Sequence, residues 1–357
     1  MNKKSAVVLI AVICFSLFLS SGVTATEKKP VEVVMMSTPF GTLEYNIAAA
    51  YEQVFREANS WVRIKHQETP GAMYVLRYIV KNRQKMIDGQ VNHTVWSAAG
   101  VGGSLFMVEG RWPFEKFPWP DYRTLVSGPG ILSFYVTDDP DIKTLADLGG
   151  KRVGTAEKAR PFMGVLLDKP LFGNALGIYD RIKWAPLGDV GCKEAFINGK
   201  IDGYKAGFGA LIDVDENGRM FTKLIAPSPP AMEVLSSGRK LHLLPVKPEW
   251  IQKGYNPAKD LVITPVLVKK EAIPDLAKED FWATGAPTAI LCDSGLPGDV
   301  AAEIVRVRHE YRAAFAKFHA SLAFMPSTPY PFGTPGGLVH EGVAKAMDFL
   351  GLPIPKQ

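Results

Sequence analysis

The feature that most constrains the fold of this chain is a regular alternation of short β-rich runs with helical patterns. Residues 31–37 form an apolar, β-rich run, and residues 42–58 carry apolar side chains at helical spacing. A strand over 61–66, a helix over 72–83 and a strand over 91–96 follow. The β-α-β-α-β order predicts a parallel sheet with right-handed crossover connections.

The same alternation starts again at residue 132 and predicts a second unit. Its strands are expected over 132–137, 150–154, 182–186 and 201–206, and its helices over 142–148, 161–167 and 190–197. The rest of the chain contains few strands, a long amphipathic helix over 301–322 and a last helix over 339–350. Because such a tail would not form its own core, we expect it to return to the first unit. The prediction is an α/β fold of two lobes, 31–131 with 244–357 and 132–243.

Residues 1–25 have the features of a secretory signal peptide. Lys3 and Lys4 precede an apolar run over 6–19, and a stretch of small residues ends at Ala25. The alternative is a membrane anchor, but the run is shorter than the ~20 apolar residues that cross a bilayer. We expect the segment to be removed and the protein to be periplasmic, without a membrane span. Export would permit a bridge between Cys192 and Cys292 without requiring one.

Four loops of the predicted sheets are candidates for ligand binding. In open parallel sheets, ligands lie beyond the carboxyl ends of strands, where helix N-termini favour an anion. The four loops combine hydroxyl groups, glycines, aromatic rings and cations at this place. Their predicted ligand-binding residues are Ser37, Thr38, Phe40, Gly41, Thr69, Gly71, Trp96, Ser97, Thr155, Lys158 and Arg160, with Tyr204 and Phe208 as walls beside Lys205. For each loop taken singly, the alternative is an ordinary turn with a helix cap.

Arg160 is the candidate for direct contact with the ligand. A guanidinium near a helix N-terminus can hold a carboxylate through two parallel hydrogen bonds. The alternative is a solvated arginine beside Glu157. Both interpretations fit the sequence equally well.

The sequence also argues against several classes of function. The 41 basic and 36 acidic residues are dispersed, with a formal charge of +5, so no nucleic-acid partner is expected. Motifs of serine hydrolases, zinc proteases and nucleotide-binding proteins are missing from the sequence. The acidic run over 138–141 lacks the glycine and glutamate of a calcium loop, and is interpreted as a turn with a helix cap. We therefore predict no catalytic residues, no metal site, no cofactor and no enzymatic activity.

Three stretches resemble the TAXI family, the substrate-binding receptors of a subgroup of TRAP transporters. They are residues 35–41 after the first strand, residues 145–154 in the second unit, and residues 333–340 before the last helix. The resemblance implies a type II-like periplasmic binding protein, with a ligand cleft between two lobes. It also implies a small organic carboxylate as ligand and a TRAP-type membrane permease as partner. We expect the receptor to be a monomer.

The chain departs from the family in both loops of the expected pocket. Pro39 and Phe40 stand in place of a glycine run followed by paired tyrosines, and residues 157–161 replace a loop rich in glycine and serine. The resemblance therefore implies a carboxylate-bearing solute without identifying it. A receptor for an ABC importer or a tripartite tricarboxylate system is an alternative, because the same fold serves these systems. An exported enzyme is the alternative from another class, since distant residues can form a site that no motif reveals.

Overall fold

A computed structural model describes residues 28–99, 104–215, 219–255, 263–331 and 336–354. The predicted signal peptide, residues 1–25, lies outside the described residues. By its internal contacts the chain divides into residues 1–30 and 31–357, and the description below concerns the second of these units. No helix among the described residues is long and apolar enough to cross a membrane.

Within the described residues, nine strands form one sheet, in the order β2-β1-β3-β11-β10-β8-β7-β4-β9, and β11 also pairs with β4. Two more strands, β5 and β6, form a second, small sheet. The strand bounds are β1 Val31–Ser37, β2 Val62–Glu68, β3 His93–Ala99, β4 Tyr122–Thr137, β5 Arg152–Thr155, β6 Lys183–Pro186, β7 Tyr204–Val214, β8 Met220–Pro227, β9 His242–Leu244, β10 Thr264–Val268 and β11 Phe281–Asp293.

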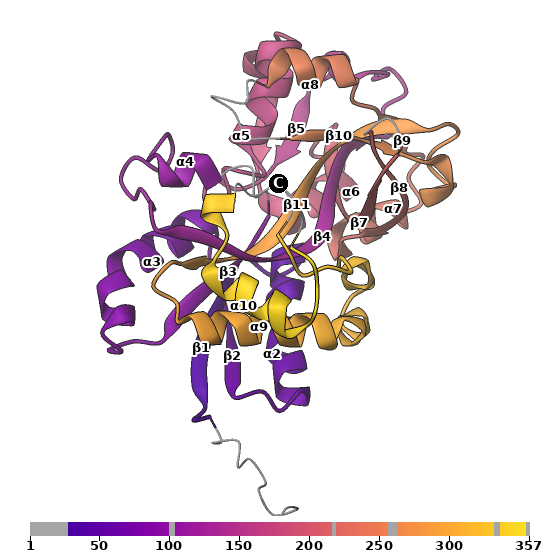
Figure 1. The fold of residues 1–357 in the computed structure, drawn as a ribbon. Coiled ribbons are helices and arrows are strands. Elements are labelled where there is room, and N and C mark those ends of the chain that lie inside the picture. Colours follow the sequence, from indigo (N-terminus) through magenta and orange to yellow (C-terminus); the bar gives the residue numbers. More distant parts are fainter. Residues whose placement is uncertain (1–27, 100–103, 216–218, 256–262, 332–335, 355–357) are drawn as a thin grey trace, which may run out of the picture. The chain divides into compact units, whose positions relative to one another are not determined.

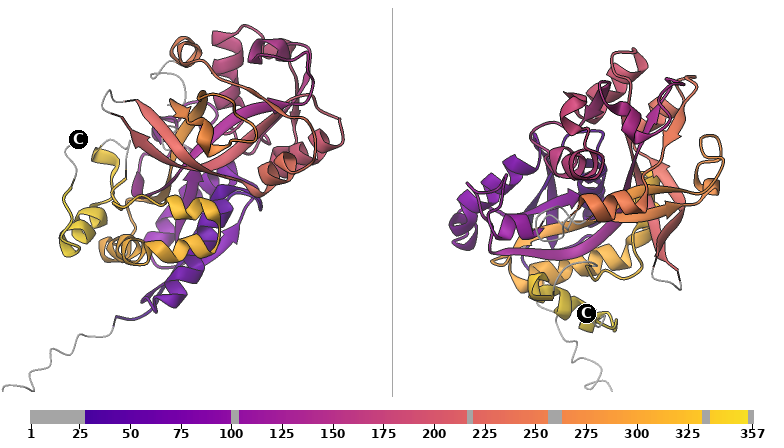
Figure 2. Two further views of the ribbon diagram at one scale, coloured as in Figure 1. Left: turned by 90° about the vertical axis from the view of Figure 1, so that its right-hand side faces the viewer. Right: turned by 90° about the horizontal axis from the view of Figure 1, so that it is seen from above.

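The strands fall into two groups, which are the two lobes of an α/β fold. Figure 1 shows β1 and β2 in the lower part of the view and β5 in the upper part, with the long strands β4 and β11 between them. β11 pairs with β3 through residues 288–292 and with β10 through residues 281–285, so one strand belongs to both groups. Figure 2 shows the same arrangement from two further sides. The predicted fold class is confirmed, whereas the predicted lobe boundaries remain a prediction.

The strand pairing is mixed, which differs from the mostly parallel sheets that we predicted. β1 is parallel to β2 and β3, and β5 is parallel to β6, as expected. β4, β7 and β11 are antiparallel to their neighbours. One physical cause is the short connection between β7 and β8, since only antiparallel strands can be joined by a tight hairpin. The sequence Asn217-Gly218 at this connection is a hairpin signal that the analysis above missed.

The helices confirm part of the predicted pattern. The bounds are α2 Leu43–Glu57, α3 Ala72–Ile87, α4 Ser104–Val108, α5 Val165–Asp168, α6 Gly188–Ile197, α7 Pro229–Leu235, α8 Pro248–Gly254, α9 Gly298–Glu310 and α10 Glu341–Phe349. The apolar spacing that predicted α2 buries Tyr51 and Val54 against Ile304 of α9. Thr42 caps α2, since its hydroxyl accepts the amide of Tyr45 at 3.1 Å.

The prediction of one long helix over 301–322 was wrong. α9 ends at residue 310, and two 3₁₀ segments over 312–317 and 320–324 follow. The second segment has its own cap, because Nδ1 of His319 accepts the amide of Ser321 at 3.1 Å. Apolar residues keep a helical spacing beyond residue 310 because Phe315 packs with the side chains of α2 and α9, although the backbone there is no longer α-helical.

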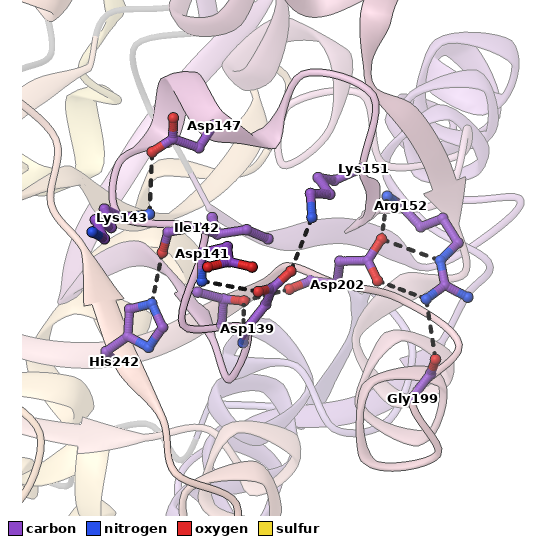
Figure 3. A network of polar contacts seen from close by, with 11 residues as sticks. Asp139, Asp141, Ile142, Lys143, Asp147, Lys151, Arg152, Gly199, Asp202 and His242 are labelled. Carbon is purple, nitrogen blue, oxygen red and sulfur yellow. Dashed lines mark hydrogen bonds and ion pairs between the residues drawn. The ribbon is translucent and has the colours of Figure 1, made fainter.

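The acidic run over 138–141 is a turn, as predicted, but the predicted helix cap was wrong, because the next helical turn begins at residue 145 and is capped by Thr144 and Asp147. Oδ1 of Asp139 accepts the amide of Asp141 at 3.0 Å, and its Oδ2 lies 2.9 Å from the Lys151 ammonium (Figure 3). Asp147 accepts the amides of Lys143 and Thr144 and so caps the 3₁₀ turn over 145–148. Part of the stretch that resembles the TAXI family therefore shapes the entry into β5.

Candidate ligand-binding site

A cavity of about 60 Å³ lies between elements of the two lobes. One buried water requires roughly 10–15 Å³, so the cavity would hold about four to six waters, which is enough room for a small solute. Its wall combines the start of α2, the middle of β4, the loop after β5, α6, β7 and a 3₁₀ turn. The lining residues are Thr42, Leu43, Glu44, Asn46, Ile131, Ser133, Gly154, Thr155, Ala156, Arg160, Met163, Asp189, Cys192, Tyr204, Lys205, Gly207, Phe208, Gly209, Ser228, His319 and Ser321.

Arg160 lies in this wall at the centre of three carboxylates. Its Nη1 is 2.9 Å from Oδ2 of Asp189 and 3.6 Å from Oε2 of Glu157, and its Nη2 is 3.9 Å from Oε1 of Glu44. The Arg160 side chain is only 5% exposed, so the alternative of a solvated arginine does not apply, although Glu157 is indeed its neighbour. Because Glu44 belongs to α2, Asp189 to α6 and Glu157 to the loop after β5, this ion cluster joins three separate parts of the cavity wall.

Burial and charge act in opposite directions on this cluster. Desolvation raises the pKa of Glu44 above its ordinary 4.5, and the nearby Arg160 charge offsets part of that rise. Burial alone would lower the pKa of Arg160, but the carboxylates of Asp189, Glu44 and Glu157 outweigh it and raise that pKa. The guanidinium therefore stays charged, and no part of its charge is left without a counter-ion.

A second ion pair is buried beside the cavity. The Lys205 ammonium of β7 lies 2.6 Å from Oδ1 of Asp168, and also donates to the carbonyl of Met163 at 2.8 Å. Asp168 accepts two further hydrogen bonds, from the hydroxyl of Tyr135 at 2.7 Å and from that of Thr155 at 2.6 Å. Each charge in this network has its partners, so it holds the cavity wall in place.

One buried polar atom among the lining residues has no hydrogen-bond partner: it is Nδ2 of Asn46. Tyr204 also belongs to the lining and is 2% exposed. Burial raises the pKa of Tyr204, so the hydroxyl is protonated and can donate. Since nearly all buried polar groups in folded proteins are hydrogen-bonded, the Asn46 amide indicates a place for a polar solute or for water.

Four of the thirteen predicted binding residues line the cavity: Thr155, Arg160, Tyr204 and Phe208. The other nine lie outside its lining: Ser37, Thr38, Phe40, Gly41, Thr69, Gly71, Trp96, Ser97 and Lys158. Two of the nine hold the first turn of α2, which does line the cavity. Thr38 shares a hydrogen bond with the capping hydroxyl of Thr42 at 2.8 Å, and Ser97 donates to the carbonyl of Glu44 at 2.6 Å.

The remaining predicted residues have other surroundings. Ser37 shares a hydrogen bond of 2.8 Å with His66, and Thr69 donates to the carbonyl of Ser37 at 2.6 Å. Phe40 is 64% exposed and Lys158 is also exposed. Trp96 is buried in a core cluster. As ligand contacts these residues stay a prediction, although none of them lines the cavity.

Sequence reasoning missed several lining residues. Glu44 and Asn46 stand in the first turn of α2, so the rule that helix N-termini face the ligand could have found them. Asp189 stands in the first turn of α6 in the same way. His319 and Ser321 come from the cap and first turn of a 3₁₀ segment, which the sequence presented as the end of a long helix.

Comparisons with known proteins give fold likenesses at low identity. No family model and no curated protein matches the chain. Among solved structures, MatC from Rhodopseudomonas palustris with bound malate is 13% identical with a TM-score of 0.48, covering 89% of this chain and 99% of that one. The alkanesulfonate-binding protein SsuA from Xanthomonas axonopodis pv. citri bound to MOPS is 13% identical with a TM-score of 0.43, covering 92% and 96%. The periplasmic aliphatic sulphonate binding protein SsuA from Escherichia coli is 14% identical with a TM-score of 0.42, covering 90% and 93%. Likenesses of this size assign neither a function nor a ligand to the chain.

Proposed function

We propose that this protein is a periplasmic solute receptor, which binds a small organic carboxylate between its lobes and delivers it to a TRAP-type membrane permease. The observation that carries the proposal is the cavity between the lobes with the unpartnered Asn46 amide in its wall, beside the buried Tyr204. A polar solute would satisfy the Asn46 amide, whose lack of a partner costs free energy.

Arg160 is the proposed anchor for the carboxylate. Its bond to Asp189 would be exchanged for a bond to the solute, because the Asp189 side chain is 37% exposed and can turn toward solvent. Glu44 is only 5% exposed and would stay beside the guanidinium. The capped first turn of α2 adds backbone N–H groups and a partial positive charge on the other side of the cavity.

Ligand binding would favour closure, because the wall of the cavity comes from both lobes. A solute that touches α2 and β7 together binds the closed arrangement better than an open one, and so shifts the population toward it. Export and the permease partner are supported by residues 1–25 and by the resemblance to the TAXI family. The alternatives are a receptor for an ABC importer or a tripartite tricarboxylate system, and an exported enzyme.

The test is a screen of the purified protein without residues 1–25 against small organic acids, by thermal unfolding and then by titration calorimetry. A receptor gains about 2.7 kcal/mol of stability at a ligand concentration of 100 Kd. Arg160→Ala should weaken carboxylate binding by about 1.5–3 kcal/mol. Arg63→Ala, at an exposed arginine of β2 outside the cavity lining, is the matched control and should leave the Kd unchanged.

Asp189→Asn separates this proposal from a receptor for cations. Removing the competing carboxylate should strengthen the binding of an organic acid, whereas it should weaken the binding of an amine. If no organic acid stabilises the protein, or if a stabilising acid is turned over to a product, the proposal is wrong.

A further inference from the structure

A second, smaller cavity of about 20 Å³ adjoins the first one. Both cavities are lined by Ile131, Ser133 and Met163, so they meet at these three residues. At the same volume for each water, the smaller cavity would hold about one or two waters. It is therefore an annex of the ligand cavity, large enough for a short chain of carbon atoms.

The annex is apolar, in contrast to the main cavity. Its lining adds Phe162, Leu167 and Ile263, all of them buried, and contains no charged side chain. The hydroxyl of Thr284 already has a hydrogen-bond partner, because it donates to the carbonyl of Ser133 at 2.9 Å. Apolar cavities of this kind stay dry and accept apolar groups. The main cavity next to it carries the charges of Glu44, Arg160, Asp189 and Lys205.

Resting on the function proposed above, we infer that the solute is a monocarboxylate with a short alkyl group. Its charged head occupies the main cavity, and the alkyl group of about two or three carbons passes Ile131 and Met163 into the annex. A dicarboxylate of the same length is rejected, because its second carboxylate would be buried without a partner among apolar side chains. The annex thus sets the specificity of the receptor for the side chain of the solute.

The test measures binding as a function of chain length. The purified protein is titrated with pyruvate, 2-oxobutanoate, 2-oxopentanoate and 2-oxoglutarate, and with the matching 2-amino acids alanine, 2-aminobutanoate, norvaline and glutamate. Each added CH₂ should tighten binding about fourfold in at least one series. The dicarboxylate should bind at least ~10-fold more weakly than the alkyl compound with the same number of carbons.

Two variants change the annex in opposite directions. Ala286→Leu places a larger side chain in the annex wall, and should abolish the gain with chain length while leaving the shortest acid bound as before. Leu167→Ala enlarges the annex and should move the optimum to a longer chain. Ala313→Leu, at an exposed position outside both cavities, is the matched control for the first variant. Circular dichroism and the unfolding midpoint verify that each variant is folded.

The outcomes distinguish this inference from the function on which it rests. If acids bind but affinity does not change with chain length, or if the dicarboxylate binds best, the inference is wrong and the receptor function stands. If wild-type protein binds acids with the expected chain-length dependence and Ala286→Leu does not alter it, the alkyl group lies elsewhere and the annex is not its site. If no acid of either series binds, the proposed function fails and the inference fails with it.

Discussion

The buried pair of Lys205 and Asp168 gives the sharpest prediction for stability. Asp168 is 2% exposed and the Lys205 side chain 9%, with 2.6 Å between Nζ and Oδ1. Lys205→Met keeps an aliphatic chain of similar length but removes the ammonium charge, and with it the hydrogen bond to the Met163 carbonyl. The carboxylate of Asp168 then keeps its hydrogen bonds from Tyr135 and Thr155 but has lost its counter-ion.

The expected loss is large because the remaining charge stays buried. Removing one partner of a buried ion pair costs about 3–5 kcal/mol, a large share of the 5–15 kcal/mol by which a typical domain is stable. Lys269 and Asp280 form a matched pair at the surface, 2.7 Å apart and 31% and 37% exposed. Lys269→Met should therefore cost less than about 1 kcal/mol, because water screens the pair.

Urea unfolding followed by tryptophan fluorescence measures both variants, since the chain has seven tryptophans. Adding Asp168→Asn to Lys205→Met removes the unpaired charge, and should restore part of the lost stability. A double-mutant cycle then gives a coupling free energy of several kcal/mol for the buried pair. A Lys205→Met variant within about 1 kcal/mol of Lys269→Met would refute the argument that burial determines the cost.

Three further predictions concern single residues near the cavity or its rim. Burial raises the pKa of Glu44 above 4.5, so the folded state binds more protons than the unfolded state in this range. The free energy of unfolding should therefore fall as pH rises from about 4.5. Glu44→Gln should make the urea midpoint depend less on pH across this range. Gly71 has a φ of 141°, and an added Cβ would lie 2.8 Å from the carbonyl oxygen of Ala159, so Gly71→Ala should cost about 1–3 kcal/mol in the same assay. Burial raises the pKa of Cys192 to about 12 and that of Cys292 well above its usual range, and both thiols are free. Both should react with Ellman's reagent only after unfolding, and rapid labelling of the native protein would contradict this.

The first half of the fold could be predicted from the sequence because its periodicities report burial directly. The predicted runs over 31–37 and 42–58 lie within two residues of β1 and α2 at each end. Those elements bury one face each, so apolar side chains mark their period. β8 (220–227) escaped because its burial alternates irregularly, and its hairpin partner β7 was expected to end at residue 206.

Residues of the candidate site could be predicted only where they stand at the end of a predicted strand or just after it. Thr155 is the last residue of β5, and Arg160 belongs to the loop after it, so a rule about strand ends was enough for both. His319 and Ser321 reach the cavity through tertiary folding of a segment whose apolar spacing matched a helix. Periodicity reports which side chains are buried, but it does not report where the backbone leaves the helical conformation.

Arg160 shows why a residue type at the expected place does not by itself define a binding site. From the sequence alone, Arg160 was a candidate to bind the carboxylate of a ligand, and Glu157 was the only acidic residue expected beside it. In the fold, Glu44 from α2 and Asp189 from α6 also face it, so its charge is already compensated. A ligand carboxylate gains only the difference between its own bond to the guanidinium and that of the carboxylate it displaces. Selectivity must then come from what the solute adds beyond that exchange, which is contact with Asn46 and Tyr204 and with the apolar annex.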